Sequence, residues 1–222
     1  MEQLFVKHKL YNSPKEVQKH LMNVTAKLRQ QVLEDAALED TNAVKNGIYD
    51  LVKKCHLETI RFLKDKYKIE IKYDENNLPL EKLFFNKDKK TLNDRLDPLF
   101  KIYAIDKNDG LGSLWRGLEL IMVTEITTTV NKTLIAPFRY AKKHDIDLGY
   151  EFIYHVEYNG CDECNDYGGE FYDFEEAIEP PFHPGCQCSF DIVEEEVEAD
   201  TVDGIIVDED ELECVNSFLD TL

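Results

Sequence analysis

The sequence lacks both a basic charge balance and a long apolar run. Its 222 residues include 26 Lys and Arg against 45 Asp and Glu, a formal net charge of −19 at pH 7. A surface this acidic repels nucleic acid, so direct DNA binding is disfavoured outside a local basic patch. The chain has no uninterrupted run of about 18 apolar residues, so we expect no membrane span.

Patterns for common catalytic sites are also missing. There is no Gly-x-Ser-x-Gly and no Gly-rich phosphate-binding loop. The acidic segment 106–113 lacks the final Glu that a calcium loop needs. His155-Val-Glu157 ahead of Cys161 superficially resembles a zinc deaminase signature, but only three residues separate Glu157 from Cys161 and no Pro precedes that cysteine. We therefore expect no enzymatic activity and assign no catalytic residue.

The segment from Cys161 to Cys188 holds four of the six cysteines and one of the six histidines. It reads Cys161-Asp-Glu-Cys164, then Gly168-Gly169, then Pro-Pro-Phe-His-Pro-Gly-Cys-Gln-Cys over 180–188. Because Glu2 follows Met1 without a charged-then-apolar leader, we expect no signal peptide, which disfavours disulfides. A reduced thiol cluster and one or two disulfides are the alternatives to a metal site. The second Cys-x-x-Cys of a common zinc ribbon is missing.

Thiolate sulfur and imidazole nitrogen in this density favour a structural zinc ion with four tetrahedral ligands. The candidate ligands number five: Cys161, Cys164, His183, Cys186 and Cys188. The four sulfurs make the simplest set, and His183 is able to replace Cys161. Both sets remain open. Cys55 and Cys214 lie outside this segment, and we interpret them as core or tail thiols.

Helical periodicity dominates the first two-thirds of the chain. Ser13 and Pro14 open a predicted helix that runs to about Leu38, and a second helix is predicted from Thr41 to Tyr67. A third is predicted over 91–104, followed by a loop over 106–113. A fourth begins at Ser113 and continues through Tyr140, with Pro137 expected to kink or restart it.

Strands are expected only around the cysteines and in the acidic tail. Apolar alternation predicts a strand over 151–158, and 189–193 is expected to be the strand that leaves the cluster. The fold class is therefore α+β: a mostly helical N-terminal two-thirds with a small C-terminal β-hairpin zinc-binding module. A metal in such a module replaces missing apolar burial. The acidic segment 194–222 is expected to be a solvated tail, with one short strand near 205–207 as an option.

Residues 113–193 resemble the phage head-morphogenesis family of Mu F-like minor head proteins. The family pattern places a Thr-Glu pair and a downstream Asn on a helix, then a strand, a first Cys pair, a Gly turn and a Pro-Pro-x-His-Pro-x-Cys-Arg-Cys motif. Here Thr124-Glu125, Asn131, the Cys161–Cys164 pair, and residues 180–188 follow in that order. Gln187 replaces the usual Arg, and the Asp-x-Arg before the first Cys is missing.

The resemblance implies a minor structural protein of a tailed-phage head that acts in capsid assembly. It implies association with the portal or major capsid proteins, a place inside the capsid, and the host cytoplasm during assembly. It divides the chain into a helical arm (1–112), a core with the Cys/His cluster (113–193) and the acidic tail (194–222). The family pattern favours Cys164, His183, Cys186 and Cys188 as ligands. The alternatives are a host-directed protein–protein adaptor that uses the tail and a zinc-dependent hydrolase.

Overall fold

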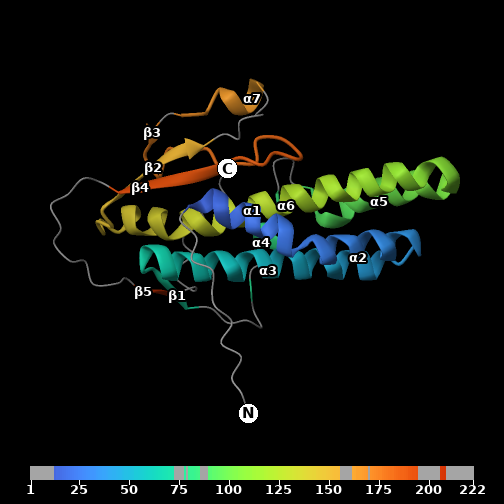
Figure 1. Ribbon diagram of the computed structural model, residues 1–222, viewed down its shortest axis with the longest axis horizontal. Coiled ribbons are helices and arrows are strands. Elements are labelled where there is room, and N and C mark those ends of the chain that lie inside the picture. Colours follow the sequence, from blue (N-terminus) through green and yellow to red (C-terminus); the bar gives the residue numbers. More distant parts are fainter. Residues whose placement is uncertain are drawn as a thin grey trace, which may run out of the picture.

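The computed structural model describes residues 13–72, 78, 80–85, 90–155, 162–169, 171–194 and 206–208. Within these ranges the chain is mostly helical with a few short strands (Figure 1). The long helices lie side by side, and a small sheet covers one end of them. None of the described helices is long and apolar enough to cross a bilayer.

The helix predicted over 13–38 is divided in two. Helix α1 spans Pro14–Val24 and helix α2 spans Ala26–Ala37, with Ser13 capping α1 through its side chain as expected. The break is at Thr25, whose buried hydroxyl donates a hydrogen bond back to the Leu21 carbonyl. Such a bond competes with the regular helical pattern and bends the chain. The bend lets α1 and α2 pack on different neighbours.

The prediction for 41–67 is confirmed by helix α3, Thr41–Tyr67. The Asp40 side chain accepts a hydrogen bond from the Ala43 N–H at 2.9 Å, and Lys68 ends the helix in the left-handed conformation at φ 60°. Cys55 is fully buried on the inner face of α3. Burial raises its pKa to about 12, which fits the expected core thiol.

Helix α5, Leu92–Ile105, confirms the prediction for 91–104 and begins with a capping box between Thr91 and Asp94. A four-residue helix, α4 (Leu80–Leu83), precedes it. The basic run 87–90 falls mostly outside the described residues.

Helix α6, Lys107–Lys143, is longer than predicted. The prediction of a loop over 106–113 is wrong, because the helix has already begun there. The Gly110 N–H donates a hydrogen bond to the Asp106 carbonyl at 2.8 Å. Gly110 also lets α6 approach α5 closely, since a Cβ there would lie 3.1 Å from the Cα of Tyr103. The helix also continues through Pro137, where the burial of Phe138 and its neighbours outweighs the lost hydrogen bond. The boundary expected at residue 112 therefore falls inside one continuous helix.

The predicted strands around the cysteines pair with one another. Strand β2 (Tyr150–His155) is central, with β3 (Phe171–Tyr172) on one side and β4 (Ser189–Glu194) on the other. Both pairings are antiparallel, and the β2–β4 register runs from Tyr150 opposite Glu194 to His155 opposite Ser189. A four-residue helix, α7 (Asp162–Asn165), lies between β2 and β3 in the chain. The rest of the strand expected over 151–158 lies outside the described residues.

The acidic C-terminal segment returns to the helical part of the molecule. Strand β5 (Ile206–Asp208) pairs in parallel with β1 (Glu70–Lys72), so that Val207 lies opposite Ile71. The short strand that we considered near 205–207 is thus present at 206–208. Cys214 and the rest of the segment 209–222 lie outside the described residues.

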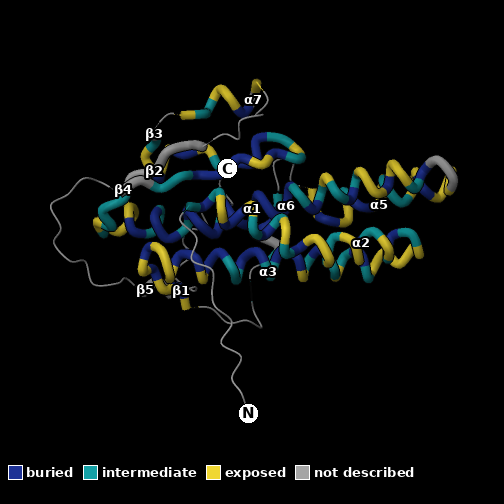
Figure 2. Tube along the Cα trace, in the orientation of Figure 1, coloured by how far each residue is buried: buried dark blue, intermediate teal, exposed yellow. Residues whose placement is uncertain are grey.

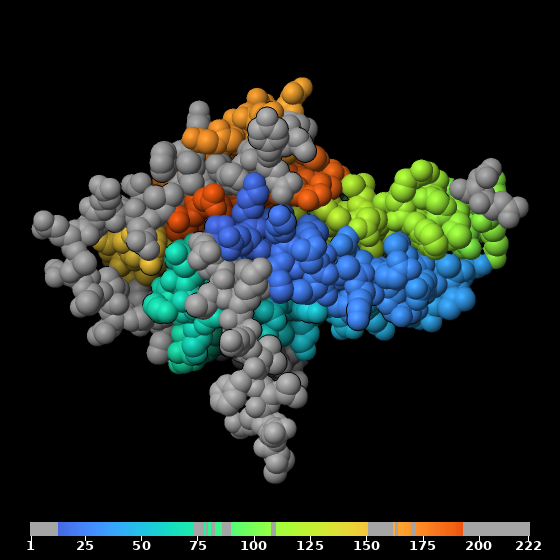
Figure 3. All heavy atoms as spheres, in the orientation of Figure 1, coloured from blue at the N-terminus to red at the C-terminus, as the bar shows by residue number. Residues whose placement is uncertain are grey.

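One hydrophobic core runs between the helices and under the sheet. Helices α3 and α6 form its centre, α5 and α2 flank them at one end, and β4 covers α6 at the other (Figure 2). Helix α1 packs on both α6 and β4, and lies at the surface beside the segment that leads into β4 (Figure 3). The cysteine segment is therefore built directly on the helical core.

Candidate metal centre

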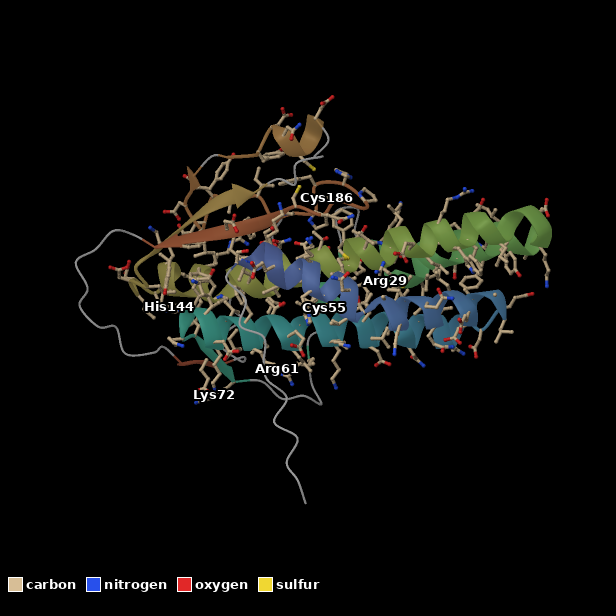
Figure 4. All side chains as sticks on the ribbon, in the orientation of Figure 1. Arg29, Cys55, Arg61, Lys72, His144 and Cys186 are labelled. Atoms are coloured by element: carbon tan, nitrogen blue, oxygen red, sulfur yellow. The ribbon has the colours of Figure 1, made fainter. Side chains whose placement is uncertain are left out.

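Three cysteines that the sequence singles out converge in space. Cys164 is in α7, while Cys186 and Cys188 are in the segment before β4. Cys186 is labelled in Figure 4. Their sulfur atoms all lie within 4.8 Å of one another, and each residue is 2% exposed. The Cys164 and Cys186 sulfurs are 3.7 Å apart, close to the separation of about 3.8 Å that tetrahedral zinc thiolates require. These three buried cysteines are close enough to bind a metal ion.

His183 lies at the edge of this group. Its Nε2 atom is 3.2 Å from the Cys164 sulfur, and its Nδ1 atom is 3.0 Å from the Pro184 carbonyl oxygen. A proton on Nδ1 that is donated to this carbonyl leaves the Nε2 lone pair directed at the cysteines, the usual arrangement for a ligating histidine. Cys161, the fifth candidate, lies outside the described residues.

The protonation of the cysteines also suits a cation. The pKa of Cys186 is lowered to about 5, chiefly because the Cys188 thiol donates a hydrogen bond to it, with help from the Cys188 and Phe182 N–H groups. The pKa of Cys188 is raised, because its proton is held in that bond and because the group is buried. One thiolate thus shares a proton with its neighbour. A divalent cation that replaced this proton would be bound by thiolates, the form in which cysteine binds metals.

Polar residues of α6 hold the cysteine segment in place. The hydroxyl of Thr124 accepts a hydrogen bond from the Gly185 N–H at 2.8 Å. The Asn131 side chain donates to the Cys188 carbonyl at 3.1 Å and accepts from the Phe190 N–H at 3.3 Å. Thr124 and Asn131 are buried, so these bonds are shielded from water. They fix the backbone on both sides of Cys186 and Cys188.

Gln18 of α1 makes a further contact that sequence reasoning missed. Its side-chain amide donates to the Gln187 carbonyl and to the Thr127 hydroxyl, each at 3.1 Å. Gln18 is 5% exposed and lies beside Val17 and Leu21 on the buried face of α1. The sequence signal for this contact was a glutamine on an otherwise apolar helix face, because a buried amide needs hydrogen-bond partners.

Glu125 has a different role from its neighbour Thr124. Its carboxylate accepts hydrogen bonds from Arg95 at 2.7 Å and from the Phe85 N–H at 2.8 Å, and its side chain is fully buried. Burial raises the pKa of Glu125 to about 7, although Phe85, Arg95 and Lys132 oppose the shift. Glu125 therefore joins α5 and the segment after α4 to α6. It makes no described contact with the cysteines.

The deaminase-like pair cannot be placed at this site. The backbone of His155 ends β2 opposite Ser189, but its side chain and all of Glu157 lie outside the described residues. Comparison with family models, with curated proteins and with solved structures finds no match for this chain. Arguments about function therefore depend on the site itself.

Proposed function

We propose that this chain is a minor structural protein of a tailed-phage head, associated with the portal, whose C-terminal module is held by a structural zinc ion. The observation that carries the proposal is the pair of contacts from Thr124 to Gly185 and from Asn131 to Cys188. The residues that resemble the head-morphogenesis pattern are far apart in sequence. In the fold Thr124 and Asn131 meet the segment around Cys186 and Cys188, and this supports reading these residues as one functional unit.

For the zinc ion we propose Cys164, His183, Cys186 and Cys188 as ligands. The Cys164–Cys186 distance of 3.7 Å is near the value of about 3.8 Å for a tetrahedral site. The His183 Nε2 atom is 3.2 Å from the Cys164 sulfur but is not in the group of atoms within 4.8 Å of one another, so the imidazole would have to move toward Cys186 and Cys188 to complete the site. With four protein ligands the site is closed, which favours a structural role over catalysis. The ion would bind α7 to the segment before β4, and the small β3–β2–β4 sheet has little core of its own to do so.

The helical arm offers a surface for the proposed association. Leu38 at the end of α2 is 79% exposed, and Ile105 at the end of α5 is 87% exposed. An ion pair between Glu39 and Lys107 brings these two helix ends together. Exposed apolar side chains that gather at one tip mark contact surfaces for other proteins. We propose that this tip contacts the portal or a major capsid protein, while the net charge disfavours direct DNA binding.

Mass spectrometry of purified phage particles tests this function. We expect the chain inside the particle in few copies relative to the major capsid protein. If it is absent from particles and recovered instead in complexes with host proteins, the proposal is wrong and the chain is a host-directed adaptor.

The arm contact has its own test. Replacing Leu38 and Ile105 together by Ser should abolish co-purification with the portal and major capsid proteins. The matched control is Ile178→Ser, because Ile178 is also exposed, at 51%, but lies in the segment between β3 and the cysteines. Equal co-purification of both variants would contradict the assignment of the tip.

A further inference from the structure

Helix α1 lies on the part of the fold that carries the cysteines. It packs against α6 and β4, and its inner face buries Val17 and Leu21. The helix has only 11 residues. Helices shorter than about 12 residues are marginal in water by themselves, so α1 depends on what it packs against.

One polar contact connects α1 to the cysteine segment. The amide of Gln18 donates to the carbonyl of Gln187, the residue between Cys186 and Cys188. The same amide donates to Thr127 of α6, so Gln18 bridges the fixed helix and the segment before β4. The Gln187 carbonyl lies between the flanking Cys186 and Cys188, in a segment that Thr124 and Asn131 also hold against α6. If these sulfurs hold one ion, the carbonyl stays where Gln18 meets it.

Loss of the ion would remove the link between the sulfurs of Cys164, Cys186 and Cys188, which all lie within 4.8 Å of one another. The 186–188 segment would then be free to shift relative to α7. A shift of the 186–188 segment leaves the buried Gln18 amide without the Gln187 carbonyl. A buried donor that loses its partner raises the free energy of the folded state, so α1 packs less stably on the protein.

We propose that metal occupancy of the cysteine cluster controls whether α1 stays docked on the protein. This inference rests on the proposed zinc site and adds a regulatory role to it. Binding of the ion holds the Gln187 carbonyl in place and thereby holds α1. Release of the ion frees residues 14–24 from α6 and β4 and uncovers the apolar surface that Val17 and Leu21 occupy. The α3–α6 core keeps its own packing and remains folded.

Hydrogen exchange of the full chain, with zinc and after chelation, tests the proposal. We expect protection over residues 14–24 to fall at least about tenfold on chelation, while protection in the centres of α3 and α6 is retained. Unchanged protection of 14–24, with zinc removal verified by elemental analysis, would overturn the inference. Loss of protection throughout α3 and α6 would also overturn it, since the ion would then hold the whole fold. A chain that never binds zinc would instead refute the proposed zinc site.

A variant at Gln18 separates the effect of the Gln18–Gln187 contact from general destabilisation. Gln18→Met keeps the approximate shape of the side chain but removes its donor. The zinc-loaded variant should lose protection over 14–24 and release zinc to a chelator about tenfold faster. The matched control is Gln31→Met on α2, because the Gln31 amide is exposed and contacts only its own helix at Asp35. Zinc release from Gln18→Met at the rate of the control would contradict the coupling.

Discussion

The side-chain amide of Asn131 donates a hydrogen bond to the carbonyl of Cys188 at 3.1 Å, across 57 residues of sequence. The same side chain accepts from the Phe190 N–H, so one buried residue of α6 satisfies two backbone groups of the segment that enters β4. This relationship places the cysteine segment on the helical core with a fixed orientation.

Asn131→Ala removes both bonds and leaves two buried backbone groups without their partner. We expect the free energy of unfolding to fall by about 2–4 kcal/mol, because each such group costs about 1–3 kcal/mol. Urea denaturation followed by circular dichroism measures this change. Asn46→Ala is the control, since Asn46 is exposed in the second turn of α3. A variant as stable as the control would show that the Asn131 contacts do not hold the segment.

Cys186→Ser should lower both zinc content and stability, because its sulfur lies 3.7 Å from that of Cys164 and within 4.8 Å of that of Cys188. We expect less than one zinc per chain by elemental analysis and a clear fall in melting temperature for the zinc-loaded protein. Cys164→Ser should behave in the same way. Cys55→Ala, which alters a core thiol away from the cluster, should lose stability but keep its zinc. If the Cys164/Cys186 double variant keeps its melting temperature and solubility, the site is not structural.

Local sequence signals were sufficient for some elements and not for others. The predicted starts of α3 and α5 agree with the structure, in which Asp40 and Thr91 cap these helices, because capping depends on neighbouring residues. The break at Thr25 and the continuous path of α6 through Pro137 depend on tertiary packing, and periodicity does not contain that information. For Pro137 in particular, a local rule predicted a kink or a restart, and the helix does not restart there.

The same distinction between local sequence signals and tertiary packing applies to the candidate site. Cysteine spacing was enough to predict that Cys164, Cys186 and Cys188 converge, because soft ligands in one segment have few other reasons to cluster. The Gln18 contact could not be predicted, since it joins residues 169 positions apart and depends on how α1 packs. Similarly, nothing near β1 in the sequence indicated that Ile206–Asp208 would pair with it.

Glu125 should make stability depend on pH. Its pKa is raised from 4.5 to about 7 by burial, so the folded state holds the proton more strongly than the unfolded state. The resulting stabilisation is present below about pH 4.5 and is lost as pH rises to about 7. The full loss is up to about 3 kcal/mol. Relative to Glu125→Gln, in which this group cannot titrate, the protein should become less stable between pH 5 and about 7.5.

Urea denaturation of both proteins across this pH range checks the prediction. Titration of the cysteines is common to both proteins and cancels in the difference. A difference in unfolding free energy that does not change with pH would contradict a raised pKa for Glu125. A difference that changes in the opposite direction would mean that Arg95 dominates and lowers the pKa.

Deletion of residues 195–222 should leave the helical core folded but remove the partner of β1. We expect nearly unchanged helical circular dichroism per helical residue and faster hydrogen exchange over Glu70–Lys72, because β5 no longer pairs with them. A melting temperature lower by a few degrees is expected for the loss of about 1 kcal/mol. Collapse of the whole fold would show that the C-terminal segment is integral, and unchanged exchange at β1 would contradict the pairing.

X-ray absorption at the zinc edge of the purified, zinc-loaded chain tests the central claim most directly. The account predicts one zinc per chain with three sulfur ligands near 2.3 Å and one nitrogen ligand near 2.0 Å, and loss of the nitrogen ligand in His183→Ala. An ion-free chain that is equally compact, with Cys164, Cys186 and Cys188 freely alkylated under native conditions, would contradict it.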